Sequence, residues 1–149
     1  MNTHSIRLRF FVAIFSLSLL ITACGEKSKG EPVTPSGDVF TFDLRKIGKN
    51  EVKFFYYVYK DRAIKFLVAR SESGEVKTAF DACITCYPHK MGYRQEKDCV
   101  VCIFCNTAFR IGVLDQGVGN CVPIKIPHSI EGDTLRISLK EIEEGYKWF

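Results

Sequence analysis

Residues 53–70 read KFFYYVYKDRAIKFLVAR, and this stretch decides the fold class. Residues 53–60 and 63–70 are rich in aromatic and β-branched side chains, which are typical of strands. Asp61 and Arg62 lie between the two runs and are suited to a turn. The stretch therefore predicts two strands joined by a short turn.

Further strand-like runs lie on both sides of this pair, at the short spacing that is typical of sandwiches and barrels. They are VFTFDL (39–44), EVKTAFDA (75–82), FRIGVL (109–114), PIKIP (123–127) and TLRISL (134–139). The last residues, KEIEEGYKWF, predict a single helical turn that Gly145 stops. We expect an all-β fold, a small antiparallel sandwich or barrel that carries its cysteine-rich loops at one end.

The N-terminus has the organisation of a secretory signal. Arg7 and Arg9 form a basic leader, residues 10–21 form a 12-residue apolar run, and Thr22 and Ala23 are small residues ahead of the expected cut. This run is too short to span a bilayer, which needs about 20 residues. We therefore expect residues 1–23 to be a signal peptide that is absent from the mature protein.

Residues 21–24, ITAC, resemble the lipobox of bacterial lipoproteins. The resemblance implies cleavage before Cys24 and acylation of its thiol, so that lipid holds the protein at a membrane. Gly25 follows the cysteine and leaves open the outer membrane or the outer face of the inner membrane. The expected location is the extracytoplasmic side of a bacterial cell envelope.

The mature chain is expected to have two parts. Residues 24–37 include GEKSKGEPVTPSG, which has no periodic apolar residues and is typical of a flexible tether. Residues 38–149 are long enough for a single β domain with its own core. Removal of residues 1–23 leaves a net charge of +2, which does not indicate a nucleic-acid partner.

The cysteine spacing carries the strongest functional signal. Five of the seven cysteines fall within residues 83–105, CITCYPHKMGYRQEKDCVVCIFC. Cys83 and Cys86 form one C-x2-C pair, and fifteen residues separate it from a second pair, Cys102 and Cys105. Two such turns can present four thiolates to one ion, and soft thiolates select zinc, iron, iron–sulfur clusters or Cu(I). The spacing predicts a metal site and does not name the metal.

Neighbouring residues add to the candidate site. Cys121 can return to it as an additional ligand, whereas Cys99 and His89 are weaker candidates. Cys99 is surplus to the two pairs, and His89 is expected to be a solvated loop residue. Asn106 follows Cys105 and can adopt the left-handed backbone that a tight thiolate turn requires.

Two other uses of the cysteines remain open. If lipid occupies Cys24, six cysteines are left, and an oxidising compartment would allow three structural disulfides. A disulfide framework normally spreads its cysteines along the chain, whereas these are crowded. A redox-active dithiol is the other use, and it needs one exposed cysteine with a depressed pKa.

The segments FDACITC, GYRQ, VVCIFCNTAF and GNCVPI together resemble the FtrD-like membrane iron–sulfur family. The likeness covers about residues 38–127 and rests on an ordered set of positions: Asp81, Ala82, Cys83, Cys86, Gly92, Tyr93, Cys102, Cys105, Phe109, Gly119, Cys121 and Pro123. The chain departs from the family pattern at Asn106, Asn120 and Val122, and Cys99 is additional. A fainter likeness to Rieske domains suggests a similar outline of two metal-binding loops.

The leading hypothesis is an electron carrier with an iron or iron–sulfur centre, and the resemblance implies a link to ferrous-iron uptake through a redox or iron-transport partner. Tyr93, Phe104 and Phe109 would shield the centre and tune its potential. Arg7 and Arg9 are split by Leu8, so no twin-arginine signal is present for export of a folded, preloaded cluster. Metal acquired outside the cytoplasm favours a single iron or zinc ion.

No acid–base pair stands out, so we do not expect an enzyme. The alternative functions are a structural zinc module or metallochaperone, which is colourless and folds around its ion, and a thiol–disulfide oxidoreductase.

Overall fold

The computed structural model describes residues 30–149. The expected signal peptide, Cys24 and the first part of the expected tether lie outside these residues.

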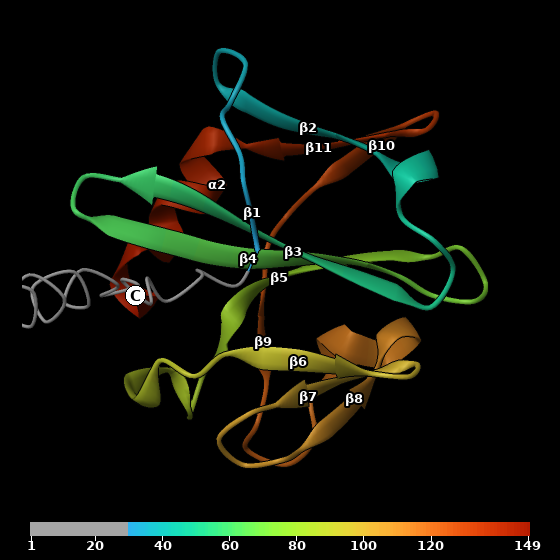
Figure 1. Cartoon of the computed structure of the whole chain (residues 1–149), viewed down its shortest axis with the longest axis vertical. Coiled ribbons are helices and arrows are strands. Elements are labelled where there is room, and N and C mark those ends of the chain that lie inside the picture. Colours follow the sequence, from blue (N-terminus) through green and yellow to red (C-terminus); the bar gives the residue numbers. More distant parts are fainter. Residues whose placement is uncertain (1–29) are drawn as a thin grey trace, which may run out of the picture.

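A five-stranded sheet runs through the middle of the described part of the chain (Figure 1). Its strands, in spatial order, are β1 (Glu31–Pro32), β3 (Glu51–Tyr59), β4 (Arg62–Arg70), β5 (Val76–Cys83) and β9 (Pro123–Lys125). β1 runs parallel to β3, and the other neighbours are antiparallel. β3 and β4 form the pair that their sequence predicts, with Lys60 and Asp61 as the turn, one residue earlier than expected.

Two three-stranded sheets lie on opposite sides of this sheet (Figure 1). One contains β10 (Ser129–Glu131), β11 (Thr134–Ser138) and β2 (Val39–Asp43). The other contains β6 (Tyr93–Glu96), β7 (Cys99–Cys102) and β8 (Ala108–Arg110). The predicted all-β sandwich is therefore confirmed, and it is a sandwich rather than a barrel because the sheets are not closed.

Short helices connect the strands. They are η1 (Leu44–Lys46), η2 (Tyr87–His89), η3 (Ile111–Gln116), α2 (Leu139–Glu143) and η4 (Glu144–Trp148). The C-terminal residues were expected to stop at Gly145, but helical structure continues to Trp148. Gly145 does not end the helix; it allows close packing, because a Cβ at this position would collide with the Phe80 ring.

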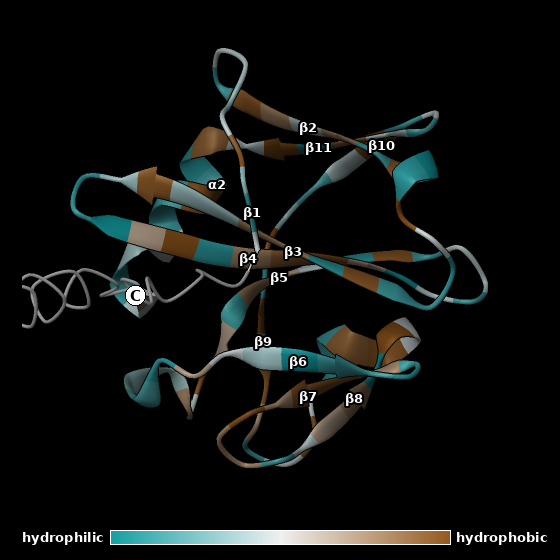
Figure 2. Cartoon of the chain, viewed as in Figure 1, coloured by the Kyte–Doolittle hydropathy of each residue, from teal (hydrophilic) through white to brown (hydrophobic). Residues whose placement is uncertain are grey.

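Two hydrophobic cores share the central sheet. Ile64 and Phe66 of β4 belong to the core beneath β2 and β11, whereas Leu67 and Ala69 of the same strand belong to the core beside β6, β7 and β8. A strand buried on both faces needs a nearly continuous apolar run, which explains the sequence FLVA at 66–69. Figure 2 shows apolar colour along parts of the central strands and on β7, and hydrophilic colour on β6.

The second core positions the cysteines. It contains Cys83, Cys102 and Cys121, packed together with Tyr93 and Phe109. The cysteine-rich stretch was expected to form loops, but it contains the hairpin of β6 and β7, whose turn includes Lys97 in a left-handed conformation (φ 53°).

Part of the segment 24–37, expected to be a tether, packs on the domain. Glu31 and Pro32 align with Phe55 and Tyr56 of β3, and the Val33 N–H donates to the Tyr56 carbonyl at 3.0 Å. An edge position tolerates Pro32, which has no N–H to donate. From Gly30 onward the chain is therefore part of the folded structure.

Candidate metal centre

β5 delivers the first C-x2-C pair. Cys83 is the last residue of β5, and Cys86 immediately precedes η2. The loop then returns to β6 through Gly92, which has a left-handed backbone (φ 67°). The buried Asp81 carboxylate accepts the Tyr93 N–H at 2.6 Å, so the strand that carries Cys83 also fixes the end of this loop.

β7 delivers the second pair. Cys102 is its last residue, and the following turn brings Cys105 back toward it. The Asn106 N–H donates to the Cys102 carbonyl at 2.9 Å, and the Cys102 N–H donates to the Thr107 carbonyl, also at 2.9 Å. Asn106 has φ 57°, which confirms the left-handed conformation predicted for it. Asn tolerates this region better than most residues, so the turn forms without the usual glycine.

Cys121 arrives from a loop far along the chain. Val118 and Cys121 exchange two backbone hydrogen bonds, which close a tight turn around Gly119. Pro123 then aligns with Cys83 where β9 pairs with β5. The Ile84 N–H donates to the Val122 carbonyl at 3.0 Å, so the Cys121 loop is fastened directly to the first pair.

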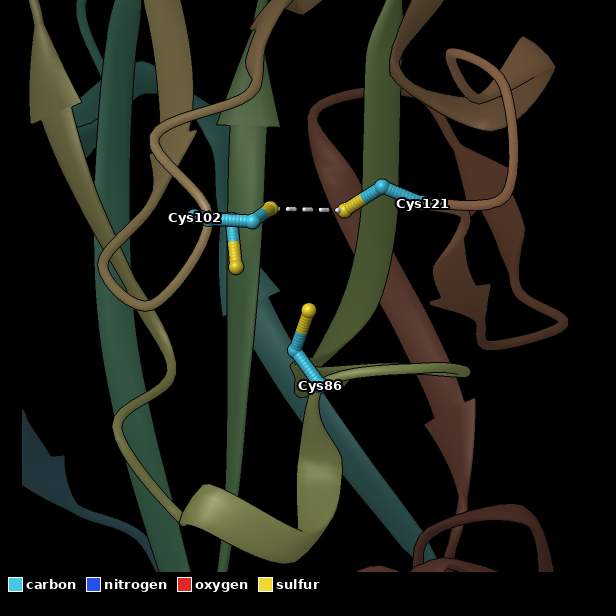
Figure 3. A group of neighbouring side chains, drawn as sticks. Cys86, Cys102 and Cys121 are labelled. Carbon is cyan, nitrogen blue, oxygen red and sulfur yellow. Dashed lines mark hydrogen bonds between the residues drawn. The ribbon is translucent and has the colours of Figure 1, made fainter.

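These elements bring four thiols into one group. The Sγ atoms of Cys86, Cys102, Cys105 and Cys121 all lie within 4.8 Å of one another. Figure 3 shows Cys86, Cys102 and Cys121 pointing toward a common centre from three separate segments. Cys102 and Cys121 are buried, Cys86 is half-buried and Cys105 is exposed, so the group has one side at the surface.

Cys83 lies directly behind this group. Its Sγ is 3.1 Å from the Sγ of Cys121. Cys83 is nevertheless not among the four residues whose Sγ atoms all lie within 4.8 Å of one another. The predicted set and the observed group thus have three members in common, Cys86, Cys102 and Cys105. Cys83 and Cys121 are both close enough for the fourth position to be decided by experiment.

The thiols differ in their pKa. Burial raises the pKa of Cys86 to about 12, and its thiol neighbours, Cys105 first, add to this shift. Burial also opposes ionisation of Cys105, but the Thr107 hydroxyl and backbone N–H, with the neighbouring thiols, lower its pKa to about 6. Burial also raises the pKa of Cys83, but hydrogen bonds from Cys121 and from the backbone N–H groups of residues 86, 85 and 122 lower it by more. The pKa of Cys83 is therefore lowered. The site thus holds some thiols ready to ionise beside others that ionise only when a cation is close.

Aromatic residues cover the inner side of the site. Tyr93 and Phe109 are fully buried and meet edge to face, with ring centroids 6.1 Å apart. Burial, followed by the Cys83 and Cys121 charges, raises the pKa of the Tyr93 hydroxyl. Both residues therefore shield the thiols, as predicted. Phe104 differs: it is 46% exposed and stacks on His89 at 3.6 Å.

The weaker candidates lie elsewhere. Cys99 begins β7, at the opposite end of the strand from Cys102, and its thiol donates to the Asp98 carboxylate at 3.7 Å. His89 stacks on Phe104 and is not in the thiol group. Cys24 lies outside the described residues. Asp81, which the sequence singles out only as part of the family pattern, is also a positioning residue; an acid inside an apolar strand just before a cysteine pair is the sequence signal for this role.

The donor set fits a soft metal ion. Thiolates bound tetrahedrally at about 2.3 Å from zinc are about 3.8 Å apart, which is compatible with sulfur atoms that all lie within 4.8 Å. Cys105 and Cys121 are already 3.5 Å apart. Ferric or ferrous iron and zinc suit the same four sulfurs, so the geometry does not choose between them.

The fold and the site are those of an all-β metal-binding protein with a group of four converging thiols. Comparison with protein families matches residues 47–149 to the family described as "Membrane iron-sulfur containing protein FtrD-like". The chain belongs to the FtrD-like family, because the match covers well over half of it.

Neither a search of curated proteins nor a search of solved structures finds a match, so the Rieske-like outline stays a prediction. Among residues 30–149 no helix is long and apolar enough to cross a membrane.

Proposed function

We propose that this protein is an electron carrier whose iron or iron–sulfur centre is held by the cysteine group. The observation that carries the proposal is the convergence of four thiols, from three separate segments, in a member of an iron–sulfur family. Iron held by thiolates can accept one electron and give it back. The protein supplies the ligands, the low-dielectric surroundings and controlled access to solvent.

The distribution of burial supports this role. Tyr93, Phe109 and the buried thiols keep water from the inner side of the site. Cys105 reaches the surface, so a partner protein can approach one edge of the centre without unfolding any element. The group of four consists of thiols alone, without a carboxylate or imidazole that could serve as acid or base. A carrier is therefore a better interpretation than an enzyme.

We place the protein at the extracytoplasmic face of a bacterial envelope membrane, held by lipid on Cys24. The lipobox-like residues 21–24 support this placement, and the family description names a membrane. The partner class that fits is a redox or iron-transport protein of a ferrous-iron uptake system. The partner would exchange electrons with the carrier as iron changes oxidation state.

The test is the metal and inorganic-sulfide content of the full chain purified in detergent without oxygen, with visible absorption and EPR spectra. Iron with a thiolate charge-transfer band and a reversible one-electron change would support the carrier. Stoichiometric zinc, with no redox response, would overturn it and leave a structural zinc module or metallochaperone.

One observation favours a second function, thiol–disulfide exchange. Cys105 is exposed and has a pKa of about 6, which is what a reactive cysteine requires. This function predicts that metal-free protein reacts with a small disulfide first at Cys105. It also predicts that the purified protein is active without any metal.

A further inference from the structure

Exposed apolar side chains gather around the cysteine loops. Seven large hydrophobic residues are exposed in residues 30–149, and four of them are on these loops: Ile84, Met91, Phe104 and Val118. Each is about half exposed, between 46% and 53%. Because a soluble surface rarely concentrates such side chains without a reason, they mark a candidate interaction site.

Ring stacking and hydrogen bonds join the loops into one surface. The Phe104 ring stacks on His89 at 3.6 Å, and the Ile103 N–H donates to the Gly92 carbonyl at 3.0 Å, so the loops that carry Cys86 and Cys105 meet. The Thr85 hydroxyl donates to the Asn120 carbonyl, which ties in the loop of Val118. We call residues 84–92, 103–107 and 117–122 the loop face. The exposed Cys105 is part of this face.

The loop face has one lysine and no acidic residue. Its sequences ITCYPHKMG, IFCNT and GVGNCV contain Lys90 and no Asp or Glu. Lys90 also lines a hollow of about 290 Å³ together with Arg62, Lys65 and Phe149. Arg62 donates to a main-chain oxygen of Phe149 at 2.7 Å, and Asp61 accepts from Tyr146. Within residues 30–149, neither Lys65 nor Lys90 forms an ion pair. Positive charge thus borders the apolar loop face.

The geometry points to the loop face and its basic hollow as a docking surface for a small acidic redox protein. This inference rests on the proposed carrier function and names the chemistry of its partner. An apolar centre around the exposed Cys105 would exclude water, while Lys65 and Lys90 would attract carboxylates on the rim of the partner. The electron that one protein loses is the electron that the other gains, with no bond made or broken.

A redox protein fits this surface better than a lipid bilayer or a second copy of the chain. Polar Thr85, Asn106 and Asn120 interrupt the apolar side chains, as in a transient protein interface, whereas insertion into lipid favours a continuous apolar face. Weak electron-transfer contacts are also small, in keeping with four apolar anchors. Two copies facing each other would place Lys65 and Lys90 against the same lysines of the other copy, and these like charges would repel.

The docking test separates binding from electron transfer. The zinc-loaded full chain, which has no redox chemistry, is titrated with a small acidic haem protein and with the same haem protein after its carboxylates are amidated. We expect binding of the acidic form alone, weakened at least tenfold from low to high ionic strength. The variant Lys65→Glu/Lys90→Glu should weaken it similarly, and Phe104→Ala should weaken it at every ionic strength.

The matched control is Lys46→Glu/Lys140→Glu, which makes the same change in charge at exposed sites outside the hollow. Equal binding of the amidated probe, or equal weakening by both double variants, would overturn the docking surface. So would concentration-dependent self-association that Phe104→Ala abolishes, or binding to anionic vesicles in place of the probe.

Failure of the function has a different signature. If the zinc-loaded chain binds the probe as expected but the iron-loaded chain exchanges no electron with it or with a neutral quinone, the carrier function fails. If the quinone exchanges electrons while the acidic probe does not bind, the carrier function stands and the docking surface is wrong.

Discussion

The Sγ of Cys83 lies 3.1 Å from the Sγ of Cys121, although the two residues are 38 positions apart in the sequence. The contact arises because Cys83 ends β5 and Pro123 begins β9, and these two residues align in the sheet. Sheet pairing therefore places a fifth thiol against the group of four. Strand register thus sets where Cys83 and Cys121 lie relative to the other thiols.

Single cysteine-to-serine variants should separate the ligands from the supporting thiol. We expect Cys86→Ser, Cys102→Ser, Cys105→Ser and Cys121→Ser to lose stoichiometric metal, because each removes one sulfur of the convergent group. Cys83→Ser should keep the metal but bind it roughly 10–100-fold more weakly, as expected for a group that orients a ligand. The measurement is metal content after competition with a chelator.

Cys99→Ser is the matched control for this series, because Cys99 is at the far end of β7 from Cys102. It should leave metal content and affinity unchanged. Loss of metal in Cys83→Ser with retention in Cys121→Ser would reverse the assignment of these two residues and restore the set predicted from the two C-x2-C pairs.

Gly92→Ala should disturb the first cysteine loop. A Cβ on Gly92 would lie 2.6 Å from the Asp81 carboxylate, and the backbone there is left-handed (φ 67°). An alanine in the left-handed region lowers the free energy of unfolding by about 1–2 kcal/mol, the conformational term. Overpacking against a buried group lowers it further, by about 1–3 kcal/mol. Chemical denaturation and metal affinity should both report the change.

Gly132→Ala provides the comparison for Gly92→Ala. Gly132 is also left-handed (φ 59°), but a Cβ there has nothing within 4 Å. Gly132→Ala should lower the free energy of unfolding by the conformational term alone, about 1–2 kcal/mol, and leave the metal affinity unchanged. Equal losses of stability in the two variants would show that the Asp81 contact does not matter.

Much of the fold could be predicted from the sequence because strand signals are local. The run at 53–70 predicted two neighbouring strands, and its aromatic and β-branched residues do form β3 and β4. β1 could not be predicted, since Glu31 and Pro32 have no strand preference and pair only because β3 offers a free edge. Gly145 misled the prediction for the C-terminus, because its small size serves a distant contact with Phe80.

The site was predictable to the extent that it depends on spacing. The spacing of the two C-x2-C pairs predicted Cys86, Cys102 and Cys105 as ligands, and all three lie in the observed group. The position of Cys121 depends on the register between β9 and β5, which the sequence of its own loop does not encode. The stacking of His89 on Phe104 depends similarly on how two loops meet.

Removal of the metal should loosen one core more than the other. Cys83, Cys102 and Cys121 belong to the core beside β6, β7 and β8, whereas the core beneath β2 and β11 contains no cysteine. Without a cation the crowded thiols lose their common partner, so that side should open locally. Hydrogen exchange with and without a chelator should show faster exchange in residues 93–110. Uniform acceleration across both cores would contradict this division.

The hydrogen bond between Tyr146 and Asp61 predicts a pH window for the C-terminal helix. The Tyr146 hydroxyl donates to the Asp61 carboxylate at 2.7 Å, which lowers the pKa of Asp61 and raises that of Tyr146. The stabilising effect should be full above the ordinary pKa of Asp, about 3.9, and below the ordinary pKa of Tyr, about 10. It should be lost as the pH falls through the lowered pKa of Asp61, or rises through the raised pKa of Tyr146.

NMR titration of labelled tyrosine tests this window. Asp61→Asn should move the Tyr146 titration down toward the ordinary range and leave the other tyrosines unchanged. Tyr146→Phe should correspondingly raise the pKa of Asp61. A Tyr146 titration that is the same with and without Asp61 would mean that the hydrogen bond does not set its pKa.

Gly145→Ala should be destabilising although alanine is the better helix former. Gly145 is buried within η4, and an added Cβ would collide with the ring of Phe80, which packs in the core beneath β2 and β11. Helix preference favours alanine by up to about 1 kcal/mol, and overpacking opposes it by about 1–3 kcal/mol. The ring of Phe80 cannot move aside at low cost, because it is 4% exposed and contacts Phe149.

Gly112→Ala is the matched control, since Gly112 is also in a short helix and its Cβ would make only an ordinary 3.8 Å contact with Ser71. Urea denaturation should give a lower midpoint for Gly145→Ala and an equal or higher one for Gly112→Ala; the reverse order would show that the Phe80 contact yields easily.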